Sequence, residues 1–112
     1  MSDCVFCRIV NGEVDSETVY EDTDIVIIKD LFPQAPVHLL AIPRKHIVSA
    51  QQVEDPVIWA KLMNGVKIVA RNLGLDEDGY RMVVNCGHQA CQSVDHLHVH
   101  VLSGRKFRWP PG

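Results

Sequence analysis

The chain has 112 residues, with 11 Lys and Arg against 14 Asp and Glu, and a formal net charge of -3 when histidine is neutral. This length suits one domain with a hydrophobic core, and the acidic balance disfavours binding to duplex nucleic acid, which requires a basic face. We find no apolar run of the roughly 20 residues that a membrane span requires. We therefore expect one domain over residues 1–112, with no membrane and no specific nucleic acid as partner.

The cysteines indicate a cellular compartment. Cys4, Cys7, Cys86 and Cys91 occur in a chain that shows no secretory leader, so we expect a reducing, intracellular setting in which thiols stay free or bind metal. The cytoplasm is the expected location, and the nucleus also fits.

The first half of the chain predicts three strands. "TVYEDTDIVIIKD" (18–30) places a turn-forming segment between two extended stretches, which is typical of a hairpin. "VHLLAIP" (37–43) is the next strand. Two prolines in "LFPQAP" (31–36) exclude a helix there and favour a rigid extended connection.

The second half predicts one main helix and two more strands. Asp55 can cap a helix whose first turn holds Pro56, and Gly74 suits its C-terminal cap. The apolar residues between them recur at helical spacing: Ile58, Trp59, Leu62, Met63, Val66, Val69, Ala70 and Leu73. After these come a turn (76–79), a strand (80–85), a loop (86–92), a strand (93–102) and a C-terminal arm (106–112). The order predicts an α+β fold with a largely antiparallel sheet.

Three histidines occupy alternate positions in "HLHVH". On a strand, His96, His98 and His100 share one face, while Leu97 and Val99 point to the other and pack on the core. Imidazoles near neutral pH can attack as nucleophiles, transfer protons or bind metal, so a row of three permits a division of labour at a phosphate group. The alternatives are a metal site, a histidine-rich surface strand or chance.

The motif has a wider context. "QSVDHLHVHVLSGR" (92–105) resembles the signature of the histidine triad (HIT) superfamily, and "DLFPQAPVHLLAIPRKH", "GYRMVVN" and "WPPG" resemble segments of its Hint branch, the histidine triad nucleotide-binding proteins. The resemblance covers nearly the whole chain. It implies a HIT-like fold with a five-stranded sheet, one main helix and a short N-terminal helix, the sheet being extended across a homodimer.

The resemblance also implies an activity. Hint proteins cleave purine nucleoside 5′-phosphoramidates, such as AMP linked to an amine, through a nucleotidyl-histidine intermediate that needs no cofactor. His98 is then the nucleophile, its Nδ1 proton held by a backbone carbonyl at the first triad histidine, and His100 contacts the phosphate and helps to protonate the leaving group. The catalytic residues implied are His98, His100, His38, His96 and Ser93.

Further positions match the family's nucleotide contacts. Asn85 positions the phosphate, Asp30 binds the ribose hydroxyls, and apolar residues enclose the base. The full implied set is Asn85, Asp30, Val5, Phe6, Ile9, Ile28, Leu31, Gln92 and Trp109, the last reaching a partner's site. Core membership explains the five apolar residues equally well, and a lone histidine entering a strand, such as His38, is more often structural.

"CVFC" (4–7) is a second chemical signal. Two thiolates at this spacing can chelate zinc, which then requires two more nitrogen or sulfur ligands. By resemblance the structural zinc ligands are Cys4, Cys7, His46 and His96; the alternative is two ordinary thiols beside the base pocket. Bound zinc would occupy His96 and stop it from exchanging protons. Cys86 and Cys91 are either free thiols or, with His88, a second metal site.

The sequence departs from the Hint pattern at two positions. Cys91 and Ser103 replace small glycines near the phosphate and in the "GGR" turn, so loop geometry and activity could differ.

Three other functions stay open. They are a dinucleoside polyphosphate hydrolase of the same superfamily, a nucleotide-binding interaction module, and a bare zinc-binding structural domain.

Overall fold

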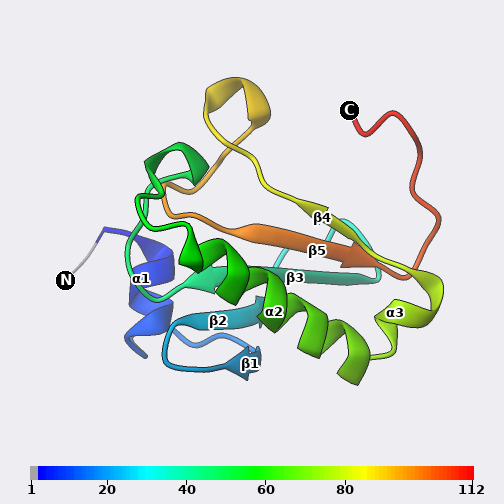
Figure 1. The fold of residues 1–112 in the computed structure, drawn as a ribbon, viewed down its shortest axis with the longest axis horizontal. Coiled ribbons are helices and arrows are strands. Elements are labelled where there is room, and N and C mark those ends of the chain that lie inside the picture. Colours follow the sequence, from blue (N-terminus) through cyan, green and yellow to red (C-terminus); the bar gives the residue numbers. More distant parts are fainter. Residues whose placement is uncertain (1–2) are drawn as a thin grey trace.

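One antiparallel sheet organises the fold of residues 3–112, which the computed structural model describes. Its strand order is β1-β2-β3-β5-β4, and every neighbouring pair is antiparallel. The strands are β1 (Thr18–Glu21), β2 (Ile25–Lys29), β3 (Val37–Pro43), β4 (Arg81–Val83) and β5 (Val99–Ser103). The helices are α1 (Val5–Val10), α2 (Val57–Asn72) and the one-turn α3 (Leu75–Asp78), with 3-10 turns at Ala50–Gln52 and His88–Ala90 (Figure 1). The α+β class, the short N-terminal helix and the main helix are confirmed.

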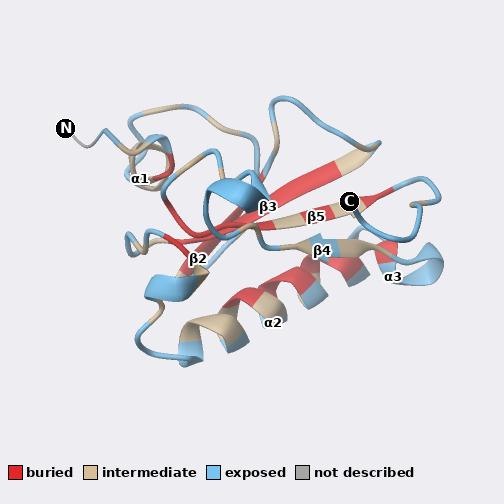
Figure 2. Cartoon of the chain, turned by 90° about the horizontal axis from the view of Figure 1, so that it is seen from above, coloured by how far each residue is buried: buried red, intermediate tan, exposed pale blue. Residues whose placement is uncertain are grey.

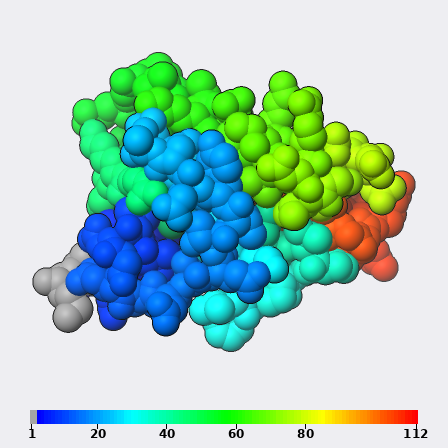
Figure 3. Space-filling model, turned by 90° about the horizontal axis from the view of Figure 1, so that it is seen from below, coloured from blue at the N-terminus to red at the C-terminus, as the bar shows by residue number. Residues whose placement is uncertain are grey.

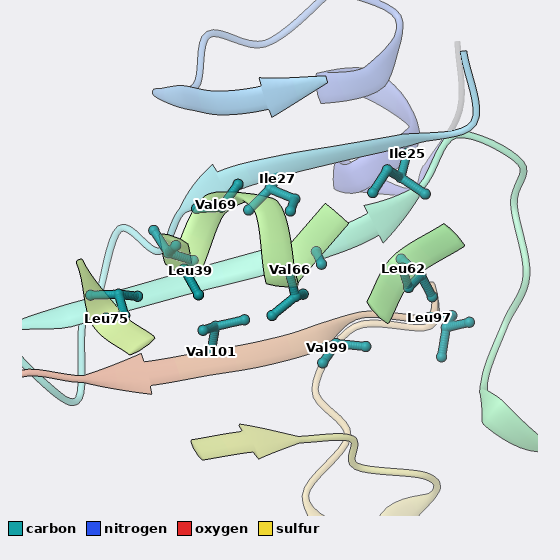
Figure 4. Packing of buried hydrophobic residues seen from close by; sticks show 12 residues of the cluster. Ile25, Ile27, Leu39, Leu62, Val66, Val69, Leu75, Leu97, Val99 and Val101 are labelled. Carbon is teal, nitrogen blue, oxygen red and sulfur yellow. The ribbon is translucent and has the colours of Figure 1, made fainter. Parts of the chain in front are cut away.

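The two faces of the sheet carry separate apolar clusters, because side chains alternate along each strand. Helix α2 covers one face, and α1 lies on the other (Figure 2). The α2 cluster comprises Ile25, Ile27, Leu39, Ala41, Leu62, Val66, Val69, Ala70, Leu75, Leu97, Val99 and Val101 (Figure 4). The α1 cluster comprises Phe6, Val26, Ile28, Leu40 and Ile42. The polar side chains of the site share the α1 face.

Helix α2 begins and ends where its sequence predicts. The carboxylate Oδ1 of Asp55 accepts a hydrogen bond from the backbone N of Val57 at 3.0 Å. Gly74 follows the last turn with φ of +73°, a conformation that glycine adopts without steric cost. Gly65 lies buried against β2, where a Cβ would overlap the Cδ1 of Ile25. Its missing side chain lets the helix approach the sheet closely.

Three of the expected element boundaries are wrong. The last strand begins at Val99 and not at residue 93, because the N–H of Leu97 bonds to the oxygen of Ile47, beyond the end of β3. Residues 93–98 are therefore irregular, although Leu97 still packs beside Val99 in the α2 cluster. The turn expected over 76–79 is instead the one-turn helix α3 over Leu75–Asp78, closed by the bond from Gly79 N to Leu75 O. The strand expected over 80–85 spans only 81–83.

The C-terminal arm has no regular structure and is attached near β4. The Arg81 guanidinium donates to the backbone oxygen of Arg108 at 3.0 Å and lies 5.2 Å from the ring centroid of Phe107. The end of the arm then leads away from the sheet (Figure 1). Across residues 3–112, no helix has the length and apolar character needed to cross a membrane.

Candidate active site and metal centre

The histidine row lies on the α1 face of the sheet, although only His100 belongs to a regular strand. His98 is 5 % exposed and packs edge to face between the rings of Phe6, at 5.2 Å, and His100, at 5.0 Å. Phe6 also packs edge to face on His96 at 5.8 Å. Helix α1 therefore supplies an aromatic wall that fixes two of the three imidazoles.

The tautomer of His98 follows from the hydrogen bond that its ring makes to a backbone oxygen. Its Nδ1 lies 2.7 Å from the backbone oxygen of His96. A carbonyl oxygen only accepts hydrogen bonds, so Nδ1 carries the proton and Nε2 keeps its lone pair. His98 is thus arranged as a nucleophile through Nε2.

His38 and His100 form a second hydrogen-bonded pair on neighbouring strands. The backbone N–H of Gln34 donates to His38 Nδ1 at 3.0 Å, so this nitrogen is unprotonated and the proton of the neutral ring lies on Nε2. His38 Nε2 lies 2.9 Å from His100 Nδ1 and 3.3 Å from Asp30 Oδ2. When His38 donates to His100, the neutral ring of His100 presents its own N–H at Nε2. This is the atom that can donate to a phosphate oxygen or a leaving group.

The electrostatics of this pair favour neutral rings. Burial, together with the nearby rings of His98 and His38, lowers the pKa of His100 to about 4. Burial also lowers the pKa of His38, against the opposing effect of the Asp30 carboxylate. Both imidazoles are therefore uncharged near neutral pH, as the hydrogen-bond directions require.

Cys4, Cys7, His46 and His96 converge at the N-terminal end of α1. The Nδ1 of His96 lies 3.2 Å from Cys4 Sγ, 3.5 Å from Cys7 Sγ and 3.2 Å from His46 Nδ1, and Cys7 Sγ lies 3.2 Å from His46 Nδ1. All four atoms fall within 4.8 Å of one another. A tetrahedral zinc ion with ordinary bond lengths separates its ligand atoms by about 3.3–3.8 Å. The four side chains fit such an ion.

The ring of His96 is also in the tautomer that metal binding requires. Its Nε2 lies 2.8 Å from the backbone oxygen of Pro43, so Nε2 holds the proton and Nδ1 is left as a ligand atom. The Cys4 sulfur accepts a hydrogen bond from the backbone N of Cys7 at 3.3 Å, which fixes its position at the start of α1. Because both ring nitrogens of His96 are engaged, its remaining contact with the histidine row is its backbone oxygen.

A second group of potential ligands behaves differently. Asp30, His38 and His100 also bring three ligand atoms within 4.8 Å of one another. However, the N–H of Gln34 occupies the lone pair of His38 Nδ1, which places the proton of a neutral ring on the very nitrogen that would bind the metal. This group is a proton-bearing array, whereas the cysteine-containing group is suited to a metal.

The remaining expected site residues occupy four kinds of position. Ser93 lines a cavity of about 510 Å³ together with Asp3, Cys4, Val5, His46, Val94 and Asp95. It therefore lies beside the cluster of Cys4, Cys7, His46 and His96. Asn85 is half-buried beyond β4, and Phe6, Ile28 and Ile9 belong to or pack against the α1 cluster. Leu31 and Trp109 are 82 % and 81 % exposed, so neither is a core residue.

Gln92 has a role in holding its own loop. Its Oε1 accepts from Gly87 N at 2.9 Å, and its Nε2 donates to the backbone oxygens of Val48 and Val94 at 2.7 and 3.0 Å. These bonds close the loop that carries Cys86 and Cys91, both of them exposed. Cys91 adopts φ of +63°, a conformation more usual for glycine.

Sequence reasoning missed the groups that orient the histidines. Pro43 orients His96 through its carbonyl oxygen and Gln34 orients His38 through its N–H. Both act through backbone atoms, which residue type does not report. The sequence also gives no sign of the edge-to-face contacts of Phe6 with His96 and His98, because the family resemblance places Phe6 only at the base.

The five-stranded antiparallel sheet, with the row of His96, His98 and His100 leading into β5, defines one class of α+β protein. A family model described as the HIT domain matches residues 11–107, and the chain belongs to the HIT family. A 14 kDa zinc-binding protein of Brassica juncea is 43% identical over 114 residues, covering 98% of this chain and 100% of the relative.

Solved structures agree with this membership. The HIT family hydrolase from Legionella pneumophila Philadelphia 1 superposes with a TM-score of 0.94 at 43% identity, covering 98% of this chain and 100% of that one. The histidine triad nucleotide-binding protein from Candida albicans gives a TM-score of 0.85 at 31% identity, covering 96% and 83% of the two chains.

Proposed function

We propose that this protein is a nucleotide hydrolase, most specifically an adenosine 5′-monophosphoramidase that cleaves purine nucleoside phosphoramidates through a nucleotidyl intermediate on His98. The observation that carries the proposal is the 2.7 Å contact between His98 Nδ1 and the His96 oxygen, which leaves Nε2 as a nucleophile. Membership of the HIT family and the names of the hydrolase and nucleotide-binding neighbours support it.

In the first half-reaction the lone pair of His98 Nε2 attacks the α-phosphorus, and the P–N bond breaks. The leaving nitrogen takes a proton from His100 Nε2, and His38 Nε2 can supply one to His100 Nδ1 across their 2.9 Å contact. The nucleotidyl imidazole of His98 carries a positive charge that offsets the proton lost from the pair. An amine leaves, and AMP stays bound to His98.

In the second half-reaction water attacks the phosphorus, and the P–N bond to His98 breaks. The proton of that water returns through His100 to the histidine pair, so one water supplies both the hydroxyl of AMP and the proton of the amine over the cycle. Two in-line displacements retain the configuration at phosphorus.

Other residues bind the nucleotide in this proposal. Ser93 and Asn85 donate to the phosphate, where each preset donor is worth about 2.7–4 kcal/mol on the scale of oxyanion holes. Asp30 binds the ribose hydroxyls with the carboxylate that also faces His38. The residues proposed for the base are Val5, Phe6, Ile9, Ile28 and Leu31.

Zinc is proposed as a structural cofactor held by Cys4, Cys7, His46 and His96. The donor set and the Nδ1 lone pair of His96 suit this ion, and relatives from Brassica juncea and Zea mays are named zinc-binding proteins. When bound, zinc supplies a rigid cross-link between α1 and the segment that carries the histidines. It takes no part in the chemical step.

A homodimer in the cytoplasm completes the proposal. Strand β4 is the last strand of the sheet, so its outer edge can pair with the same strand of a second copy. Trp109, exposed at the C-terminal end of the chain, would then be able to reach the partner's nucleotide site.

Steady-state turnover on a substrate panel tests the activity. We expect an adenosine phosphoramidate to be hydrolysed with a higher kcat/KM than diadenosine polyphosphates. His98→Ala should lose turnover while still binding AMP in calorimetry. Preference for the dinucleotides would favour the polyphosphate hydrolase, and AMP binding without any turnover by the native protein would favour a nucleotide-binding module.

A further inference from the structure

A chain of contacts joins the C-terminal end of β5 to His38. The Nη2 of Arg105 donates to the backbone oxygen of Gln34 at 3.1 Å. The N–H of that same residue donates to His38 Nδ1 at 3.0 Å, and its side-chain Nε2 donates to the oxygen of Phe32 at 3.1 Å. Two hydrogen bonds therefore fix the backbone of Gln34, one of them to the histidine pair, and a third holds its side chain.

Arg105 is itself held in place. Gly104, with φ of +96°, lies so close to the loop between β2 and β3 that a Cβ would come within 2.7 Å of Pro36 Cβ. The Arg105 guanidinium stacks on the Phe107 ring at 4.3 Å. In Figure 3 the orange C-terminal segment borders the cyan loop that joins β2 to β3. The turn after β5 is thus docked against the loop that it supports.

We propose that Arg105 is a positioning residue that holds the Gln34 N–H on His38 and so keeps His38 in the tautomer with its proton on Nε2. The effect on catalysis rests on the proposed function, but the effect on the tautomer does not. Arg105 touches neither the histidine row nor the reacting atoms in this account; it acts through the backbone of Gln34.

The tautomer matters because of the 2.9 Å contact between His38 Nε2 and His100 Nδ1. If the proton of His38 moved to Nδ1, two nitrogen lone pairs would face each other across this contact. His100 would relieve the repulsion by moving its own proton to Nδ1, which would leave Nε2 without a donor for the leaving group. Losing the Gln34 contact would therefore lower kcat more than it raises KM.

Long-range ¹H–¹⁵N correlation spectra of ¹⁵N-histidine-labelled protein at neutral pH test the tautomer directly. We expect His38 of the native protein, assigned through His38→Gln, to show an unprotonated Nδ1 and a protonated Nε2. In Arg105→Gln we expect a mixture of the two His38 tautomers. In Arg105→Lys we expect a smaller share of the tautomer that is protonated on Nδ1. Arg71→Gln, with the same loss of charge at the far end of α2, should leave the His38 signals unchanged.

Kinetics on the same proteins separate the two proposals. Arg105→Gln should lower kcat about tenfold with KM nearly constant, a part of the usual contribution of a general acid. A tautomer shift without any phosphoramidase activity in the native protein would support the positioning role and defeat the proposed function. A native His38 protonated on Nδ1, or an unchanged tautomer in a folded Arg105→Gln, would overturn the role of Arg105. If that variant fails to fold, the comparison rests on Arg105→Lys, in which a His38 tautomer identical to the native one would overturn it.

Discussion

His96 joins the cysteine-containing cluster to His98: its ring Nδ1 faces the sulfurs of Cys4 and Cys7, and its backbone oxygen lies 2.7 Å from His98 Nδ1. The proposed nucleophile is therefore oriented by the peptide group of a proposed metal ligand. The Pro43 oxygen, 2.8 Å from His96 Nε2, anchors the same residue to the end of β3. This arrangement explains how a structural metal can matter to a reaction in which it takes no part.

Zinc binding should depend on the sulfur atoms of Cys4 and Cys7. We expect elemental analysis to find about one zinc per chain in protein from cells grown with added zinc. It should find close to none in the double variant Cys4→Ser, Cys7→Ser. Because only the folded state presents the site, zinc at a thousand times its Kd adds about 4 kcal/mol to the free energy of unfolding. Cys86→Ser, at an exposed cysteine, is the matched control and should keep its zinc. Native protein that binds no zinc would contradict the assignment.

Stability should fall on acidification because His100 is neutral in the fold. Its pKa is lowered from 6.5 to about 4, so between these values the unfolded chain binds more protons than the native one. The contribution of the neutral His100 ring to the free energy of unfolding is fully present above pH 6.5 and is lost as pH falls toward 4. Urea unfolding from pH 4.5 to 7.5, in a Cys4→Ser background to remove metal release, should show a weaker pH dependence in His100→Asn. Equal pH dependence in the two proteins would refute the shift.

Gly65 should resist replacement by alanine. A Cβ at this position would overlap the Cδ1 of Ile25 and contact Ile27 Cδ1 and Tyr20 Cε2, each at 3.5 Å. Overpacking a core costs about 1–3 kcal/mol, which exceeds the gain of about 1 kcal/mol in helix propensity. We expect Gly65→Ala to lower the free energy of unfolding by about 1 kcal/mol in urea titrations. Asn64→Ala, on the exposed side of α2, should stabilise slightly, and a stabilised Gly65→Ala would show that the helix has room to move.

The proposed dimer predicts a mass of twice the 12.6 kDa of one chain in sedimentation equilibrium. Val84, 37 % exposed directly after β4, lies at the expected pairing edge, where a lysine side chain opposes strand addition. Val84→Lys should weaken the dimer at least tenfold, whereas Val57→Lys, at the exposed start of α2, should not. A native protein that sediments as a monomer at all concentrations would exclude the dimer.

Much of the fold could be predicted from periodicity. The turn and the β-branched residues of 18–30 predict the hairpin that supplies Ile25 and Ile27, and the helical spacing of Leu62, Val66 and Val69 predicts the helix that packs on them. Alternation separated Leu97 and the other apolar residues of the motif from the three histidines. These features depend on side-chain burial, which the spacing of apolar residues along the chain indicates.

The rest depends on backbone contacts between distant segments. The last strand starts late because Leu97 bonds to Ile47, a partner that no local pattern reveals. The orientation of His38 depends on the N–H of Gln34, and Arg105 reaches the oxygen of the same residue from 71 positions away. Such contacts exist only after the sheet has formed, so residue type alone does not predict them.

The central claim is that His98 Nε2 forms a bond to the α-phosphorus. The most direct measurement is rapid mixing with an adenosine phosphoramidate labelled at this phosphorus, followed by a denaturing quench at alkaline pH, where a phosphorus–imidazole bond survives, and peptide mapping. We predict label on the peptide that carries His98 within the first turnover and none in His98→Ala. Turnover by the native protein with no label on His98, or label that persists in His98→Ala, would contradict the account.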